Sequence, residues 1–437
     1  MNEGIKTMSN PYEISEIRAM EILDSRGNPT VQAEVLTKEG YGRAMVPSGV
    51  STGRFEAVEL RDGDSNRYHG KGVKKAVENI LSILAPSLIG MDSRQQRVID
   101  EKLRKLDGTP NKERLGANAL LGVSLAVAKA ASDTAIQHLF EYLGNRDKYI
   151  LPVPMMNIIN GGAHAGNQLA IQEFLIMPIG FNKFSKALRA GVDVYQTLGK
   201  VLLQKYGIVG KNLGDEGGFA PPMLETREAL DAIIAAIEEE GYKPGKEIGL
   251  ALDAAANEFH SKGKYSIDGH DLSSGDLHEY YQKLCAEYPL ISIEDPFEEN
   301  AFEDFVDLTR AIGKSVQIVG DDIFVSNTER LQKGIDMGAA NALLLKVNQI
   351  GTLTEAIEAA NLAGANDYTV VVSHRSGETE NTFIADLSVA LSCGQIKTGA
   401  PARGERTAKY NRLIKINNDL GRRGQYAGAK FRQYLVL

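Results

Sequence analysis

The spacing of apolar and polar residues divides the chain into two parts. Near the N-terminus, EISEIRAMEIL (13–23) and PTVQAEVLT (29–37) alternate apolar and polar residues, and the turn-rich DSRGNP (24–29) joins them. Such alternation is typical of antiparallel strands with one wet face. Helix-like segments follow at 74–85, 93–106 and 116–133, the last nearly all small or apolar. Strands followed by helices favour an α+β domain.

The second part repeats one pattern six times: a short apolar run that ends on a charged or titratable residue. Helix-like stretches separate the runs, whose ends lie 23 to 41 residues apart. Apolar runs that alternate with helices indicate a parallel sheet covered on both faces, and right-handed crossovers place the carboxyl ends on one edge. We therefore predict a (β/α) barrel whose rim carries the residues that end the runs: Asp253, Glu294, Asp321, Lys346, His374 with Arg375, and Lys397.

The proline-containing stretch LGNRDKYILPVP (143–154) predicts the boundary between the two parts. We expect a flexible extension at 1–12, a cap domain at 13–145 and the barrel domain at 146–437. The barrel domain opens with strands in MMNIIN (155–160) and AIQEFLIMPIG (170–180), around the Gly-rich GGAHAGNQ. Helices are expected at 184–206 and 226–240, and a hairpin in EFHSKGKYSID (258–268).

Composition narrows the class of protein. The 437 residues exceed one ordinary core, and fractions of 43% hydrophobic and 24% charged residues are those of a soluble globular protein. A net charge of −8 without a basic run argues against nucleic-acid and membrane surfaces. Cys285 and Cys393 lack metal-type spacing, which favours reduced thiols. Since no signal-like or 18-residue apolar segment occurs, we expect no membrane span and a cytoplasmic protein.

Three carboxylates end successive predicted strands: Asp253, Glu294 and Asp321. Like charges brought together repel one another unless a cation lies among them, and an all-oxygen ligand set suits Mg²⁺ better than Zn²⁺. Asp295 and Asp322 directly follow two of them, and we favour the first member of each pair because strand residues alternate between inward and outward. The alternative is that all are solvated strand ends or helix caps.

Lys346 and Lys397 also end predicted strands. An inward-facing lysine is rarely structural, and near a metal and a second lysine its pKa falls, which makes a neutral amine available as a general base. The alternative is that each reaches solvent at the rim. After His374, Arg375 is suited to bidentate binding of a phosphate or carboxylate.

Further candidates lie in Gly-rich surroundings. Glu173 occurs in AIQEF, Glu216 in NLGDEGGFAPP and His164 in INGGAHAGN; taken singly, each is also compatible with an ordinary loop residue. The loop VPSGVSTGRFEAVELRDGD (46–64) resembles a phosphate cradle but lacks the GK[ST] ending of a P-loop. It is equally compatible with a lid over the barrel mouth.

Taken together, these residues resemble those of a known family, the enolases (phosphopyruvate hydratases). The resemblance runs from about residue 13 to 416 and rests on long motifs: EILDSRGNPTV, VPSGVSTG, ELRDGD, LGANALLGVSLA, INGGAHAGN, QEF, GDEGGFAP, SIEDPF, GDDIFVSN, LLLKVNQIGT, VSHRSGETE, IADLSVAL and IKTGAPARGER. It implies an α+β cap domain followed by an irregular (β/α)8-type barrel that begins with a hairpin. It also implies reversible dehydration of 2-phospho-D-glycerate to phosphoenolpyruvate in glycolysis and gluconeogenesis, by a homodimer or a larger symmetric assembly.

The resemblance implies a role for each matched position. Lys346 corresponds to the base that removes the C2 proton, and Glu216 to the acid that protonates the leaving C3 hydroxyl. One Mg²⁺ is implied on the three carboxylates and a second on Ser51 in the loop. The remaining matched positions contact the substrate: Glu173 beside the acid, Gln172 near the leaving group, Arg375 and Ser376 at the phosphate, Lys397 at the carboxylate, and His164 and His374 in the cavity wall.

Two other functions are compatible with such a chain. One is a superfamily member that acts on a different acid; the phosphate-binding Arg375 and Ser376 and the loop Ser51 argue against it. The other is a binding or scaffold protein that keeps the fold without catalysis, which loss of Lys346 or Glu216 would favour. The small departures from the common motifs, such as Arg54 and Phe55 in the loop, touch no implied role but bear on lid closure.

Overall fold

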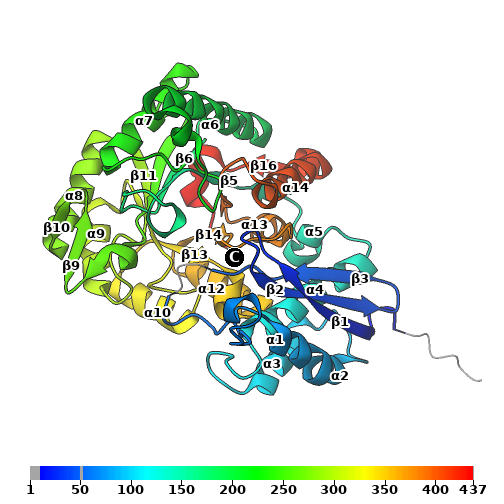
Figure 1. Ribbon diagram of the computed structural model, residues 1–437. Helices are drawn as coiled ribbons and strands as arrows, with labels where there is room; N and C mark the ends of the chain where they lie inside the picture. Colours follow the sequence, from blue (N-terminus) through cyan, green and yellow to red (C-terminus); the bar gives the residue numbers. More distant parts are fainter. Residues whose placement is uncertain (1–9, 50–52, 437) are drawn as a thin grey trace, which may run out of the picture.

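A computed structural model describes residues 10–49 and 53–436 (Figure 1). The N-terminal sheet is the predicted antiparallel meander, in the order β1 (Ile14–Leu23), β2 (Pro29–Thr37) and β3 (Tyr41–Met45). One face of this sheet packs on the buried helix α4 (Ala117–Thr134). At Gly42 the backbones approach so closely that a Cβ would lie 2.0 Å from the carbonyl oxygen of Ala126.

The other cap helices follow the predicted segments with one irregularity. The segment 74–85 forms α1 (Lys74–Asn79), a π-helical turn (Ile80–Leu84) and α2 (Ala85–Leu88) in place of one regular helix. Pro86 in the first turn of α2 has no N–H to donate, so the regular ladder of i to i−4 hydrogen bonds is interrupted there. The remaining helices of this part are α3 (Gln96–Asp107) and α5 (Leu139–Gly144).

Eight strands close into a barrel, which confirms the predicted fold class (Figure 1). Neighbouring strands are parallel except for β6, which runs antiparallel to β5 and to β7. This reversal is the early hairpin that the family resemblance implied. In chain order the strands are β5 (Val153–Asn160), β6 (Glu173–Met177), β7 (Gly249–Asp253), β11 (Leu290–Glu294), β12 (Gln317–Gly320), β13 (Ala342–Leu345), β14 (Thr369–Ser373) and β15 (Gln395–Lys397).

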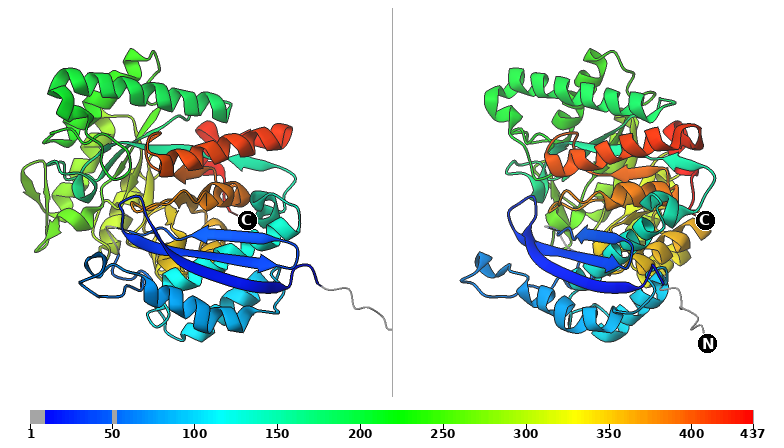
Figure 2. Two further views of the ribbon diagram at one scale, coloured as in Figure 1. Left: turned by 45° about the vertical axis from the view of Figure 1, so that its right-hand side comes forward. Right: turned by 90° about the vertical axis from the view of Figure 1, so that its right-hand side faces the viewer.

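Helices surround the barrel, and the N-terminal sheet lies beside it (Figure 2). The predicted helices at 184–206 and 226–240 are α6 (Phe184–Tyr206) and α7 (Thr226–Glu239). The predicted hairpin forms a small sheet of β8 (His260–Ser261), β9 (Lys264–Ile267) and β10 (His270–Leu272), and β4 (Tyr149–Leu151) pairs with β16 (Gly424–Tyr426). The other helices are α8 (Ser274–Glu287), α9 (Phe302–Ile312), α10 (Thr328–Met337), α11 (Val347–Ile350), α12 (Leu353–Ala365), α13 (Phe383–Leu391) and α14 (Gly404–Leu420).

The two parts of the chain share polar contacts as well as apolar core. Lys112 donates to Glu355 at 2.8 Å, and Lys129 of α4 donates to Asn381 at 2.9 Å. The predicted boundary near residue 145 falls between α5 and β4, and it stays a prediction. Of the predicted N-terminal extension, residues 1–9 lie outside the described residues. Over 10–49 and 53–436, no helix is long and apolar enough to cross a lipid bilayer.

Candidate active site at the barrel rim

The predicted rim residues gather at one end of the barrel. Asp253 and Glu294 end β7 and β11 in register with each other, and Lys397 ends β15. Asp321, Lys346 and His374 directly follow β12, β13 and β14. Glu173 joins them because β6 is reversed: its first residue pairs with Asp253, the last residue of β7.

A small polar cavity opens at this rim. It brings together the predicted site residues that the structure describes, except Glu294 and Asp321, which are not among its lining residues. Ser51 is outside the described residues. The cavity is lined by His164, Gln172, Glu173, Glu216, Asp253, Lys346, Ser373, His374, Arg375, Ser376 and Lys397.

Lys397 occupies the centre of the acidic side of the cavity. Its Nζ lies 2.8 Å from Asp253 Oδ2, 2.8 Å from Glu294 Oε1 and 3.2 Å from Glu173 Oε2. Burial lowers the pKa of the lysine, but the charges of Asp253, Glu173 and Glu294 outweigh it and hold the pKa well above its ordinary value. The contacts of Lys397 with these carboxylates therefore favour its charged form.

The carboxylates around Lys397 fit a divalent cation. Glu294 Oε2 is buried and has no hydrogen-bond partner among the described residues. Burial raises the pKa of Glu294 well above its ordinary value, and the neighbouring charge of Asp253 raises it further. One lysine does not neutralise this many buried carboxylates, so these residues could hold a further cation, and oxygen donors of this kind suit a hard divalent ion.

The acidic residues adjacent to two of these carboxylates are buried as well. We expect only the first member of each pair to face inward, but burial does not distinguish the two members. Asp295 and Asp322 are also buried and are at most 9% exposed. Asp295 accepts hydrogen bonds from the backbone N–H groups of Asp321 at 2.9 Å and of Asp322 at 2.7 Å. Asp295, Asp321 and Asp322 each bring a carboxylate oxygen within 4.8 Å of the others, a second arrangement that could hold a metal ion.

Lys346 pairs with Asp321 across the rim. Burial lowers the pKa of Lys346, but the Asp321 carboxylate raises it, and the net direction is upward. This direction is opposite to the lowered pKa that a nearby metal and a second lysine predict. The difference arises because Asp321 shares its charge with Lys346, while Gln349 Nε2 donates to the other carboxylate oxygen at 2.8 Å.

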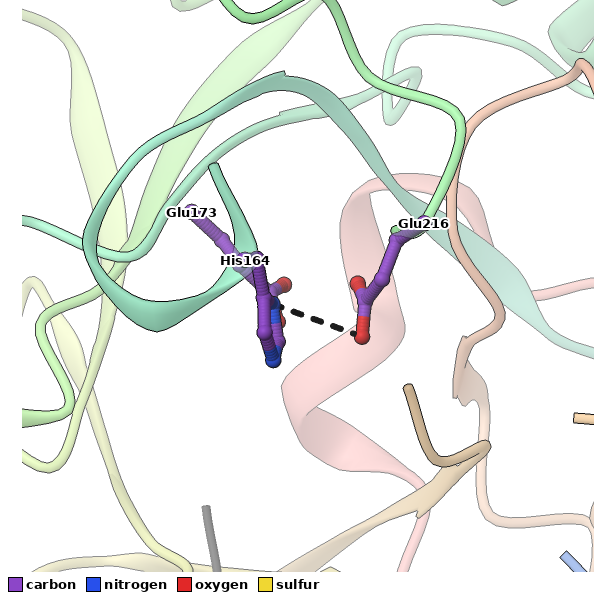
Figure 3. Close-up of side chains that lie close together, drawn as sticks. All are labelled: His164, Glu173 and Glu216. Carbon is purple, nitrogen blue, oxygen red and sulfur yellow. Dashed lines mark ion pairs between the residues drawn. The ribbon is translucent and has the colours of Figure 1, made fainter. Parts of the chain in front are cut away.

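Glu173 also belongs to a second cluster, in which Glu173, Glu216 and His164 converge (Figure 3). His164 Nδ1 lies 3.7 Å from an oxygen of each glutamate. Burial raises the pKa of Glu173 well above its ordinary value, and the charge of Glu216 raises it further. Burial also raises the pKa of Glu216, but His374 and His164 lower it, and the net direction is downward. Two buried carboxyls this close titrate as a pair that shares one proton.

The loop that carries Glu216 is held in place by its backbone. Gly217 has a φ of +83°, a left-handed conformation that glycine adopts without strain, and its carbonyl accepts from Tyr195 at 2.8 Å. The carbonyl of Glu216 accepts from Ala400 at 3.0 Å, and Asn157 Nδ2 donates to Glu216 Oε2 at 3.0 Å. The side chain is therefore fixed toward the cavity.

Arg375 is preorganised at the cavity wall. Its guanidinium bonds both carboxylate oxygens of Glu56, at 3.0 and 3.1 Å, and Asn348 Oδ1 at 2.9 Å. Burial lowers the pKa of Arg375, but the Glu56 carboxylate raises it, so the guanidinium is charged. Ser376, the next residue, also lines the cavity.

Several contributors were missed by the sequence analysis. Asn157, Glu56, Gln349 and Arg406 all contact predicted site residues, yet none ends an apolar run. Two of them lie in the family motifs: Gln349 lies in LLLKVNQIGT and Arg406 ends IKTGAPARGER. Asn157 is a polar residue inside the mostly apolar MMNIIN, and a buried polar residue in such a strand is itself informative.

Arg54 and Phe55, the two loop residues that depart from the common family motifs, each contact the barrel part of the chain. The backbone N–H of Arg54 donates to Glu299 Oε2 at 3.1 Å, and the guanidinium of Arg330 stacks over the Phe55 ring at 4.0 Å. Both contacts join the loop to the barrel rim.

Comparison with known proteins covers nearly the whole chain. Residues 14–143 match the family model "Enolase, N-terminal domain", and residues 148–435 match "Enolase, C-terminal TIM barrel domain". The chain is 60% identical to an enolase of Thermococcus kodakarensis, over 97% of this chain and 99% of that one. It is 59% identical to the enolases of Pyrococcus furiosus and Methanocaldococcus jannaschii, over 98% and 97% of this chain and 99% of each relative.

Proposed function

The chain belongs to the enolase family of hydro-lyases, and we propose that it catalyses the reversible, Mg²⁺-dependent dehydration of 2-phospho-D-glycerate to phosphoenolpyruvate. One observation carries the proposal: a lysine, a glutamate pair and a set of metal-type carboxylates line or adjoin a single small cavity. Dehydration of this acid needs a base at C2, an acid at C3 and cations at the carboxylate.

The difficulty of the reaction lies at C2. A proton next to a carboxylate is very weakly acidic, and its removal adds negative charge to a group that is already anionic. Asp253, Glu294 and Asp321 would hold one Mg²⁺ and Ser51 would bind a second, and bound Mg²⁺ offsets the charge that develops on the substrate carboxylate. Lys397, which already lies between two of these carboxylates, supplies a fixed positive charge for the same group.

Lys346 is the proposed base. Its Nζ takes the C2 proton, the electron pair left at C2 forms the C2–C3 double bond, and the C3–O bond breaks. A lysine must be neutral to accept a proton, and in the structure its contact with Asp321 favours the charged form. Any change that draws Asp321 away from Lys346 lowers the pKa of the amine and prepares it for this step.

Glu216 is the proposed acid. It delivers a proton to the departing C3 oxygen, which leaves as water, and Glu173 beside it shares that proton in the resting site. Of the pair, Glu173 is the member that burial and neighbouring charge keep protonated, so it acts as the local proton store. The proposed base and the proposed acid thus line the same cavity.

The other lining residues bind the substrate. We assign Arg375 and Ser376 to the phosphate, because Arg375 is charged and held in a fixed orientation. We assign Gln172 to the leaving hydroxyl, because its Oε1 is buried without a hydrogen-bond partner in the described part of the chain. His164 and His374 complete the wall.

We extend the proposal to the cellular setting as the family resemblance implied: action in glycolysis and gluconeogenesis, in the cytoplasm, as a homodimer or larger symmetric assembly. The net charge of −8 supports a small-molecule enzyme without nucleic-acid partners.

The two half-steps can be tested separately. In deuterated buffer with Mg²⁺, Glu216→Gln is expected to exchange the C2 hydrogen of 2-phosphoglycerate while turnover falls about 10²- to 10⁴-fold. Lys346→Met is expected to lose both exchange and turnover. Exchange that survives in Lys346→Met would overturn the assignment of the base, and a Glu216→Gln variant that forms product at the normal rate would overturn that of the acid.

A further inference from the structure

A buried arginine that the proposed function does not use lies directly behind the cavity. Arg406, in the first turn of α14, is 0% exposed. Its guanidinium donates to the backbone carbonyl oxygens of Asp215, Arg375 and Ser376 at 3.1, 2.6 and 2.5 Å. Its Nη1 also lies 2.6 Å from His374 Nδ1. Arg406 therefore joins the backbone of two site loops to the ring of one site histidine.

The contact with His374 fixes the protonation of the ring. A guanidinium has five N–H donors and no acceptor, so at 2.6 Å the His374 Nδ1 atom must be the acceptor. A ring whose Nδ1 accepts is neutral and carries its proton on Nε2. In the imidazolium form Nδ1 would also carry a proton, and its N–H would face an N–H of the Arg406 guanidinium. The pKa of His374 is consistent with a neutral ring. Burial and the charge of Arg406 lower this pKa to about 4, although the charge of Glu216 raises it.

The other edge of the ring faces the proposed acid. His374 Nε2 lies 3.3 Å from Glu216 Oε2, although the alignment falls short of a hydrogen bond. Asn157 Nδ2 donates to the same oxygen at 3.0 Å. Glu216 Oε2 thus faces two N–H groups and serves as an acceptor. The second oxygen, Oε1, lies on the side of His164, whose Nδ1 is 3.7 Å from it and 3.7 Å from Glu173 Oε1.

We propose that Arg406 is a positioning residue that locks His374 in the neutral Nε2–H tautomer, and that this tautomer, together with Asn157, confines the transferable proton of Glu216 to Oε1. The second half rests on the proposed function, since it concerns the acid of that reaction. A proton on Oε2 would face both N–H groups and would compete with the hydrogen bond from Asn157 Nδ2, which is costly in a buried site. A proton on Oε1 points toward the shared pair with Glu173.

The first test is spectroscopic and uses the wild-type protein. Long-range ¹H–¹⁵N spectra of protein labelled at its seven histidines report which ring nitrogens carry protons, and the His374 signals are identified by their loss in His374→Gln. We expect a protonated Nε2 and an unprotonated Nδ1 from pH 6 to 8. A protonated Nδ1, or a doubly protonated ring in that range, would overturn the proposal.

The second test removes the arginine. In Arg406→Met, the His374 ring is expected to populate both tautomers, and turnover of 2-phosphoglycerate to fall by about tenfold or more. If Arg406→Met is too unstable to purify, Arg406→Lys is used in its place. Lysine keeps the buried charge but lacks the planar guanidinium that bonds the His374 ring and the backbone carbonyls together. Wild-type ring signals in the folded variant would show that Arg406 does not set the tautomer.

Lys409 provides the matched control. It is a second fully buried cation of α14 and bonds Glu378 at 2.8 Å and the carbonyl of Thr379 at 2.6 Å, yet no described contact joins it to His374. Lys409→Met is expected to lower thermal stability without changing the His374 signals. If Lys409→Met changed the His374 tautomer as much as Arg406→Met, the change would reflect general loss of packing around α14, and the specific role of Arg406 would be contradicted. Because the ring signals are read without substrate, failure of this proposal and failure of the proposed reaction are distinguishable.

Discussion

At the scale of single residues, the site is a balance between buried lysines and more numerous buried carboxylates. Lys397 contacts three carboxylates and Lys346 contacts a fourth. Removing one partner of a buried ion pair leaves uncompensated charge, which costs far more than the pair itself contributes. The site residues are therefore important for folding as well as for catalysis.

This balance predicts how Lys397 and a metal act together. In chelator, Lys397→Met is expected to lower the free energy of unfolding by about 3–5 kcal/mol, since three carboxylates lose their shared cation. Saturating Mg²⁺ is expected to restore more stability to this variant than to the wild type. Thermal unfolding with and without Mg²⁺ measures both. Lys205→Met, at the exposed pair with Glu228, is the control, with a change within about 0.5 kcal/mol. An Mg²⁺ response no larger than that of the wild type would contradict this account.

Single residues also show what sequence can and cannot supply. Asp253, Lys346 and Lys397 were predictable, because each ends or directly follows an apolar run and the rim collects such positions. Their partners were not. Contacts such as Lys346 with Asp321, or Arg406 with His374, depend on side-chain directions that strand periodicity does not fix.

At the scale of elements, orientation decides which residues reach the site. β6 runs against its neighbours, so its first residue, Glu173, lies at the rim where β7 ends. Apolar periodicity predicted a strand there but carries no direction; the reversal came only from the family resemblance. The π-helical turn at Ile80–Leu84 was missed for a similar reason, since the amphipathic pattern continues through it.

The contact between β3 and α4 gives a prediction at this scale. In Gly42→Ala the new methyl group meets the backbone of α4, with the Ala126 oxygen at 2.0 Å and the Ala130 nitrogen at 2.4 Å. Neither backbone atom can move aside cheaply, so we expect a loss of about 1–3 kcal/mol or more in unfolding free energy. Gly404→Ala is the matched control, because a Cβ there meets no described atom within 4 Å beyond its chain neighbours and its own helix backbone, and it should be neutral or slightly stabilising. Equal stability of the two variants would mean that α4 does not hold its place against the sheet.

At the scale of the whole molecule, buried polar contacts join the cap helices to the barrel part, and one of them is sensitive to pH. Lys129 of α4 donates to Asn381, and burial lowers its pKa from 10.5 to about 8, although Asp386 opposes this. Below pH 8 the lysine is charged in both the folded and unfolded chains, and the cost of burying the charge is complete. Above about 10.5 it is neutral in both, and the cost vanishes. The contribution of Lys129 to the free energy of unfolding therefore rises with pH between about 8 and 10.5.

Replacement of Lys129 by Met is accordingly expected to stabilise the protein at pH 7. The gain should be about 1–3 kcal/mol and should shrink as the pH rises from 8 to 10, as measured by urea unfolding at each pH. Lys283→Met, at an exposed pair with Glu279, should show no such trend. A gain that is constant with pH would mean that apolar packing, and not the buried charge, is responsible.

The central claim is that the rim of this barrel dehydrates 2-phosphoglycerate with a divalent metal. The most direct measurement is conversion of 2-phosphoglycerate by the purified protein, followed by the ultraviolet absorbance of the enol product, first with Mg²⁺ and then with excess chelator. The account predicts turnover with Mg²⁺ that disappears in chelator and returns when Mg²⁺ is added again. Absence of turnover with Mg²⁺ would contradict the proposed reaction, and turnover that persists in chelator would contradict the role assigned to the carboxylates.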